Sequence, residues 1–154
     1  MSRNIFIIAG LLLASTISCN LAPEYNLNFA PPSDKSWPED IYPAKIAGIS
    51  PEISTKQYGG TEAKYGSNKT IYIARFTDQK EAISFFQQNV LSEFKTLSTN
   101  FSATVNGQFY AEAHDNTKKY FAWVNHRYLF VLKGNSAADF DTLVNNFNYI
   151  SKKK

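Results

Sequence analysis

Apolar residues recur at helical spacing in two separate stretches of the chain. The first stretch follows a capping-box-like start at Asp78 and Glu81 and is expected to end before Ser98. Its apolar positions are Ala82, Phe85, Phe86, Val90, Phe94 and Leu97. The second stretch follows a cap at Ser136 and Asp139, and its apolar positions are Phe140, Leu143, Val144, Phe147 and Ile150. We therefore expect two amphipathic helices.

Elsewhere, apolar and polar residues alternate with the period of two that is typical of β-strands. The stretches concerned are 55–65, 70–76, 101–114, 118–124 and 127–133. Gly59-Gly60 is interpreted as a bulge in the first stretch, and Gly107 as either a bulge or a tight turn in the third. The pattern predicts an α+β fold in β-β-α-β-β-β-α order. The predicted fold has an antiparallel sheet of about five strands, with two amphipathic helices on one face.

Turn residues indicate the register of the last three strands. A two-residue turn at Asn125-His126 pairs Trp123 with Tyr128 and Phe121 with Phe130, on the face expected to form the core. A three-residue turn over 115–117 adds Phe109, Ala111 and Ala113 to that face. The opposite face is then apolar in the middle and polar at its edge, which suits a face only partly covered. It carries Ala122, Leu129, Tyr120, Val131, Tyr110, Glu112 and His114.

The first nineteen residues have the layout of an export signal. Arg3 lies in a charged start, residues 5–14 form an unbroken apolar run, and short residues lead to Cys19, the only cysteine. A helix needs about 20 apolar residues to span a bilayer, so this shorter run favours a cleaved signal over a transmembrane anchor. A single cysteine also excludes an intrachain disulfide and a multi-cysteine zinc site.

The segment Thr16-Ile17-Ser18-Cys19 resembles the lipobox that ends the signal peptides of bacterial lipoproteins. Its last three positions match that motif, whereas Thr16 stands where leucine is usual. The resemblance covers only these nineteen residues. It implies a diacylglyceryl thioether on Cys19 and an acyl chain such as palmitate on the new amino terminus, and two or three chains anchor a protein stably. The alternatives are an ordinary secretory signal in which Cys19 happens to lie near the cleavage site, and a retained membrane segment.

All six prolines fall between positions 23 and 51, which indicates an extended segment followed by a domain of regular structure. We expect a signal peptide over 1–18, a lipid-anchored, proline-rich tether over 19–40 and a single α+β domain over 41–154. The more apolar stretch 41–53 is expected to pack on the domain. Asn20 differs from the aspartate that some bacteria use for inner-membrane retention. The expected location is therefore the bacterial cell envelope, at the outer rather than the inner membrane.

Composition and charge narrow the functional classes. The 154 residues, 44% of them hydrophobic, allow one domain with a buried core, and a net charge of +3 is too weak to argue for nucleic-acid binding. The most enzyme-like group is His114 with Asp115 and Glu112. The other histidine, His126, is expected at the opposite end of the hairpin, so the two cannot share a metal. A surface histidine beside a turn aspartate is the simpler interpretation.

The sequence therefore favours a membrane-anchored, non-enzymatic domain without a cofactor or metal. This domain is expected to bind a protein or small-molecule partner through the open sheet face or one sheet edge. The residues chosen for binding are Tyr110, Glu112, Tyr120 and Arg127. The alternative is a small envelope hydrolase or metal-dependent enzyme that uses His114, Asp115 and Glu112, and a third hypothesis is an envelope assembly component.

Overall fold

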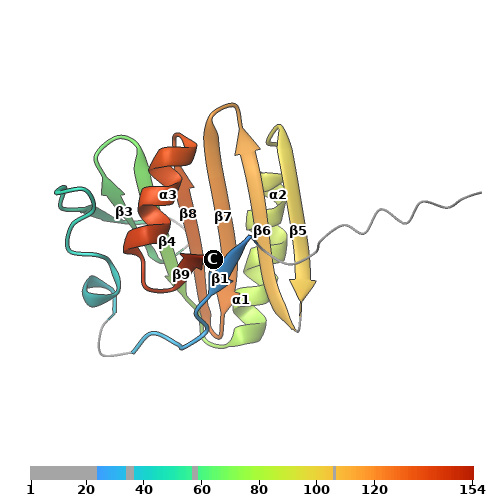
Figure 1. Ribbon diagram of the computed structural model, residues 1–154. Coiled ribbons are helices and arrows are strands. Elements are labelled where there is room, and N and C mark those ends of the chain that lie inside the picture. The colour runs from blue at the N-terminus through green and yellow to red at the C-terminus, as the bar shows by residue number, and fades with distance from the viewer. Residues whose placement is uncertain (1–23, 34–36, 57–58, 106) are drawn as a thin grey trace, which may run out of the picture.

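Seven antiparallel strands form one sheet through the middle of the protein, and two short strands form a second sheet beside it (Figure 1). The computed structural model describes residues 24–33, 37–56, 59–105 and 107–154. The main sheet has the order β2-β3-β4-β8-β7-β6-β5. Its strands are β2 (Glu52–Thr55), β3 (Thr61–Tyr65), β4 (Lys69–Arg75), β5 (Thr99–Val105), β6 (Gln108–Asp115), β7 (Lys118–Asn125) and β8 (Tyr128–Gly134).

The main sheet has more strands than expected because both glycine interruptions are turns. Gly59 and Gly60, with φ of 82° and 83°, lie between β2 and β3, and Gly107, with φ of 74°, lies between β5 and β6. A glycine with positive φ suits a bulge and a turn equally well, so the local pattern alone could not separate the two. The pairing of β2 with β3 corrects the predicted bulge at Gly59-Gly60. The pairing of β5 with β6 shows that Gly107 lies in a turn, one of the two alternatives expected for it.

Helix boundaries agree well with the caps. The elements α1 (Gln79–Phe85), η3 (Phe86–Val90, a π-helical turn) and α2 (Leu91–Phe94) follow one another without a break and form the α1–α2 helix. The backbone N–H of Glu81 donates to Asp78 Oδ1 at 2.8 Å, and the Glu81 carboxylate accepts from the N–H of Thr77 at 2.9 Å. The Asp78 cap confirms the predicted helix start, and Glu81 reaches back to the residue before the cap rather than to the cap residue itself, as it would in a strict capping box.

The second helix, α3 (Ala137–Asn146), begins at the predicted cap. The backbone N–H of Asp139 donates to Ser136 Oγ at 3.1 Å. The helix is shorter than its apolar pattern, because Phe147 lies beyond its end and Ile150 begins β9 (Ile150–Lys152). β9 pairs antiparallel with β1 (Tyr25–Leu27).

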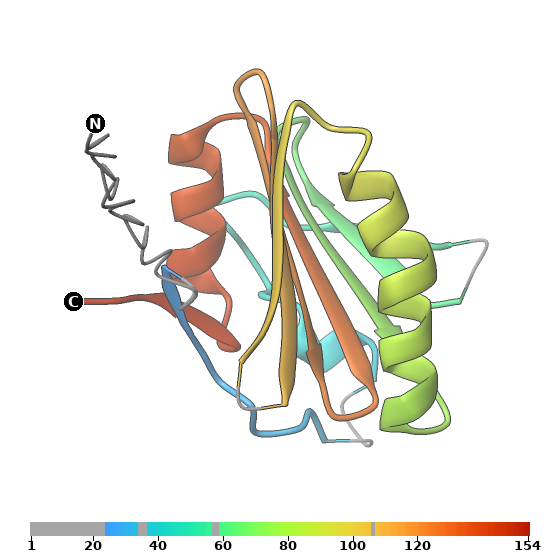
Figure 2. The ribbon, with the colours of Figure 1, turned by 90° about the vertical axis from the view of Figure 1, so that its right-hand side faces the viewer.

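The two helices lie on opposite faces of the main sheet, so the prediction of both helices on one face was wrong. Figure 2 shows the sheet between α3 on one side and the α1–α2 helix on the other. The face under α3, called the α3 face, buries large rings such as Phe121, Trp123 and Phe130. The α1–α2 face buries small side chains, namely Ala74, Ala111, Ala113 and Ala122. The central strands are apolar on both sides, so each face needs its own cover.

The register of the last hairpins decides which residues share a face. In the β7–β8 hairpin Asn125 pairs with Tyr128, so the turn is His126-Arg127 and the predicted pairing of Trp123 with Tyr128 was wrong. Trp123 lies opposite Phe130 instead, and because the register differs by two residues the predicted face assignment is kept. In the β6–β7 hairpin Asp115 pairs with Lys118, so the turn has two residues where three were expected. A slip of one residue reverses every side chain of a strand. The odd positions of β6 therefore lie on the α1–α2 face, and Tyr110, Glu112 and His114 lie on the α3 face, contrary to the prediction.

The chain before β2 completes the α3 face. Ile41, at the end of the short 3₁₀ helix η2 (Glu39–Ile41), is buried there with Tyr42 and Ile46, as expected for an apolar stretch that packs on the domain. Tyr25, within the segment predicted as a tether, is also buried on this face, and Leu27, Phe29 and Trp37 pack against it partly buried. Cys19 and the signal segment lie outside the described residues. Within the described ranges, no helix is long and apolar enough to cross a membrane.

Candidate functional site: a groove beside the α1–α2 helix

A hollow of about 440 Å³ lies between the α1–α2 helix and the strands β3, β4, β7 and β8. The helix packs on β6, β7 and β8, where the alanines of the α1–α2 face allow it to approach closely. Towards β4 and β3 the sheet extends beyond the helix, and its larger side chains there form the floor of the hollow. The volume falls in the range of small-molecule pockets, about 300–1,000 Å³.

The floor and one wall of this groove are aromatic and aliphatic. Tyr72, Tyr120 and Val131 form the floor from three adjacent strands, because alternate residues of each strand point to this face. Phe94 forms part of the wall, and its ring contacts that of Tyr120 edge to face, with 5.8 Å between centroids. Val90, at the end of the π-helical turn, lies next to it along the same wall. An apolar surface of this kind binds rings and alkyl chains.

Charged side chains stand around this apolar floor. Lys133 Nζ lies 5.5 Å from the centroid of the Tyr120 ring, a cation–π arrangement. At the far rim Lys56 and Glu62 form an ion pair of 2.8 Å, so they largely neutralise each other. Among the described residues, no carboxylate lies within ion-pair distance of Lys133. The Lys133 ammonium is therefore the cation of the groove that remains open to an anionic group.

The tyrosine hydroxyls of the floor stay protonated over the physiological range. Burial, with a contribution from the Glu62 carboxylate, raises the pKa of Tyr72 to about 12. Its hydroxyl donates to the carbonyl oxygen of Gly59 at 2.9 Å, which ties the β2–β3 turn to the edge of the groove. Burial likewise raises the pKa of Tyr120. The floor therefore offers hydroxyl donors and aromatic surface rather than acid–base groups.

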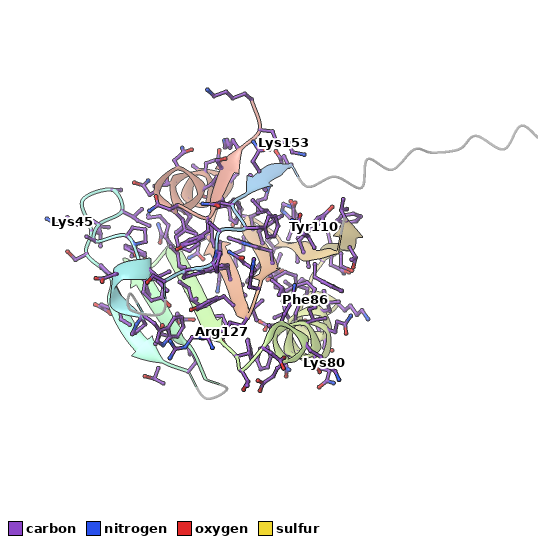
Figure 3. All side chains as sticks on the ribbon, turned by 90° about the horizontal axis from the view of Figure 1, so that it is seen from below. Lys45, Lys80, Phe86, Tyr110, Arg127 and Lys153 are labelled. Atoms are coloured by element: carbon purple, nitrogen blue, oxygen red, sulfur yellow. The ribbon has the colours of Figure 1, made fainter. Side chains whose placement is uncertain are left out.

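The structure separates the four residues chosen from the sequence. Tyr120 lies in the groove, whereas Tyr110 is 2% exposed on the α3 face, where its ring stacks on Phe121 at 6.0 Å. Figure 3 shows Tyr110 and Phe86 of the α1–α2 helix on opposite sides of the sheet, with Arg127 at one end. Arg127 lies in the β7–β8 turn, its guanidinium 5.9 Å from the Tyr128 ring. The predicted four-residue surface does not exist.

Glu112, the fourth of these residues, belongs to a charged cluster on the α3 face. Its Oε1 lies 2.9 Å from His114 Nε2 and 3.2 Å from Lys119 Nζ. Lys119 also reaches Glu24 at 3.3 Å, beside β1. Asp115, the other member of the enzyme-like group, alternates to the opposite face and meets Ser98 Oγ at 3.4 Å. The three residues of the enzyme hypothesis therefore do not form one site.

Sequence reasoning did not choose Tyr72, Val131 or Lys133 as binding residues. Alternation along each strand indicates which of its residues share a face. It does not show that β4, which is followed in the chain by the α1–α2 helix, lies beside β8, because only the sheet order decides this. In the described parts of the chain, no three His, Cys, Asp or Glu side chains lie close enough to hold a metal ion.

Comparison with the models of known protein families finds no match, and comparison with curated proteins finds none either. Among solved structures, the crystal structure of a GTP binding regulator from Thermotoga maritima is similar over 66% of this chain and 71% of its own. The two are 13% identical, with a TM-score of 0.39. So distant a likeness carries no argument about function. The groove is therefore interpreted from its own residues.

Proposed function

We propose that this chain is a lipoprotein of the bacterial cell envelope, held at the outer membrane by lipid on Cys19, whose domain binds a small amphipathic ligand without catalysis. The observation that carries the binding proposal is the groove beside the α1–α2 helix, with an aromatic floor and a lysine, Lys133, that no carboxylate of the described residues pairs with. Support for the anchor comes from the lipobox-like segment before Cys19. Binding without chemistry is favoured because Glu112 and His114 lie on the opposite face of the sheet, and none of the three enzyme-like residues lines the groove.

The groove suits a ligand with a flat or extended apolar body and one anionic group. The body would lie on Tyr120 and Val131, and the anionic group would meet the Lys133 ammonium. Glu93 also borders the groove, but its side chain is exposed, whereas Lys133 is half-buried over an aromatic ring. A less solvated charge interacts more strongly with a ligand. We therefore expect Lys133, rather than Glu93, to make the groove prefer an anionic ligand.

Two naphthalene dyes test this chemistry, because they share an apolar body and differ in charge. Anilinonaphthalene sulfonate carries an anionic group, and N-phenyl-1-naphthylamine carries none. We expect the full chain to bind both dyes with increased fluorescence. Val131→Trp, which fills the floor, should abolish binding of both. Lys133→Gln should weaken the sulfonate by about tenfold or more, the value of a hydrogen bond to a charged group, and leave the neutral dye unchanged.

The matched control is Lys118→Gln. Lys118 stands two residues before Tyr120 on the same face of β7 but does not line the groove. Its substitution should leave the affinity for both dyes as in the wild type. Equal affinity of the sulfonate for wild type, Val131→Trp and Lys133→Gln would place the dye elsewhere and refute the groove as the binding site.

The anchor is tested independently of the groove. Mass spectrometry of the mature N-terminal peptide should find an acylated Cys19. Cys19→Ser should move the protein from the membrane fraction to the soluble fraction of the envelope without changing dye binding. An unmodified Cys19 in the mature protein, or membrane association unaffected by Cys19→Ser, would refute lipidation.

A further inference from the structure

The main sheet has two edges, and they differ in how they are protected. β2, at one edge, has four residues, follows Pro51 and carries Glu52. β5, at the other edge, has seven residues, TNFSATV, without a charge or a proline. Natural proteins shield exposed edges by short strands, charges and prolines, because an open edge pairs readily with another strand. β2 has all three of these features and β5 has none of them.

Among the described residues, no strand pairs with the outer side of β5. Figure 2 shows β5 in front of the rest of the sheet, with α3 to one side and the α1–α2 helix to the other. Alternate residues of an edge strand direct their N–H and C=O groups away from the neighbouring strand. The first four residues of β5 are exposed, and Phe101 is 41% exposed although it is the largest of them. Such an edge offers both backbone hydrogen bonds and apolar contact.

The helices leave room for a further strand beside β5. On the α1–α2 face, a hollow of about 200 Å³ lies between Ser102 and Thr104 of β5 and Phe86 of the helix. On the α3 face, Phe101 rests against Tyr110 with 6.1 Å between ring centroids, and its outer side stays open. Neither helix therefore blocks an incoming strand.

The side chains of β5 are self-complementary about its central residue. Antiparallel pairing of two copies of β5 centred on Ser102 sets Phe101 of one copy opposite Ala103 of the other, twice. The same register sets Asn100 opposite Thr104 and Thr99 opposite Val105. A large ring thus meets a small residue, polar side chains face one another, and no like charges come together.

We propose that β5 is a self-association strand, through which two copies of this chain pair antiparallel about Ser102. The pairing joins their two main sheets into one continuous sheet with twofold symmetry. We choose a second copy as the partner because its own β5 supplies the matching residues, a small Ala103 for Phe101 and a large Phe101 for Ala103. The groove beside the α1–α2 helix is not part of this interface.

Cysteine cross-linking tests the register directly. In the full chain carrying Cys19→Ser, so that the introduced thiol stands alone, Ser102→Cys should give a disulfide-linked dimer on mild oxidation. Directly opposed residues have Cα atoms about 4.5–5.5 Å apart, within the range of a disulfide. Asn100→Cys is the matched control on the same strand and face. Its own twofold mate lies four residues further along, about 13 Å away, so it should stay monomeric.

A mixture of Asn100→Cys and Thr104→Cys chains should form the mixed dimer that the register requires. Sedimentation should show a dimer for the wild type and a monomer for Ser102→Lys, which sets two like charges opposite each other. The circular dichroism spectrum of Ser102→Lys should match that of the wild type, which shows that the variant loses the dimer and not the fold. A monomeric wild type, no cross-link at Ser102→Cys, or equal cross-linking at Ser102→Cys and Asn100→Cys would overturn the proposal. A disulfide-linked product with a different protein would overturn it as well.

Discussion

The side-chain amide of Asn125 donates a hydrogen bond of 3.1 Å to the carbonyl oxygen of Ala30, which lies 95 positions earlier in the chain. The same Nδ2 atom reaches the carbonyl oxygen of Asn28 at 3.3 Å. Asn125 is completely buried at the end of β7. A buried amide with two long-range acceptors holds the N-terminal segment against the hairpin end.

Asn125→Ala should lower the free energy of unfolding by about 1–3 kcal/mol, because the two partly buried hydrogen bonds of its amide are lost. Chemical denaturation followed by tryptophan fluorescence measures the loss. The control is Asn146→Ala, which removes an exposed amide that donates to Thr142 at 2.8 Å within one helix. A loss for Asn125→Ala no larger than for the control would contradict this role.

Stability should fall as the pH rises above 10. Burial raises the pKa of Tyr42, Tyr65 and Tyr72, the last to about 12, above their ordinary value of 10.0. Their contribution is complete below pH 10 and is lost as the pH rises through the higher folded-state pKa, because the unfolded chain gives up these protons first. Denaturation at pH 8 and pH 11 should show a smaller fall for Tyr72→Phe than for the wild type. An identical fall in both proteins would contradict the assignment to Tyr72.

Gly134→Ala should lower the free energy of unfolding by about 1–3 kcal/mol through overpacking. A Cβ atom at this position would overlap the backbone of Phe140, where the first turn of α3 rests on β8. Gly107→Ala is the control, because its Cβ would meet open space and only the positive φ of 74° opposes it. Thermal melting compares the two. A melting temperature for Gly134→Ala at or above that of the wild type would show that α3 can shift away from β8.

Lys119→Met should destabilise the α3 face, with a loss of about 1–3 kcal/mol for a partly buried ion pair. The Lys119 ammonium contacts Glu112 at 3.2 Å and lies 5.0 Å from the centroid of the Tyr25 ring, so it links β7 to β6 and β1. Glu112→Gln in the same chain should restore part of the loss, since no carboxylate is then left without its lysine. Additive losses in the double variant, measured by urea denaturation, would show that the two residues act independently.

Much of the fold could be predicted from local patterns. Asp78 with Glu81 and Ser136 with Asp139 located the helix starts because a cap is a contact between residues three apart. Alternation located the strands for a similar reason. The predicted number of strands was too low because Gly59-Gly60 was interpreted as a bulge, and the choice between a bulge and a turn at Gly107 was left open. The same backbone freedom of glycine serves a bulge and a turn.

The site was less predictable, and Tyr110 and Tyr120 show why. Both were placed on one open face by a turn assumed to have three residues. The turn has two, and this difference of one residue moved Tyr110 into the core of the α3 face and left Tyr120 in the groove. Lys133 and Tyr72 line the same groove only because β4 and β8 are neighbours in the sheet.

The sequence by itself determined the two helices with their starts and the alternation of the main-sheet strands, since these properties depend on residues close together in the chain. Only the tertiary structure decided which neighbour covers each apolar side. That choice set α3 and the α1–α2 helix on opposite faces, left the groove between helix and sheet, and made β5 an open edge. The choice of neighbours depends on contacts between distant segments. β1 and β9, for example, lie more than a hundred residues apart, and no local pattern encodes their pairing.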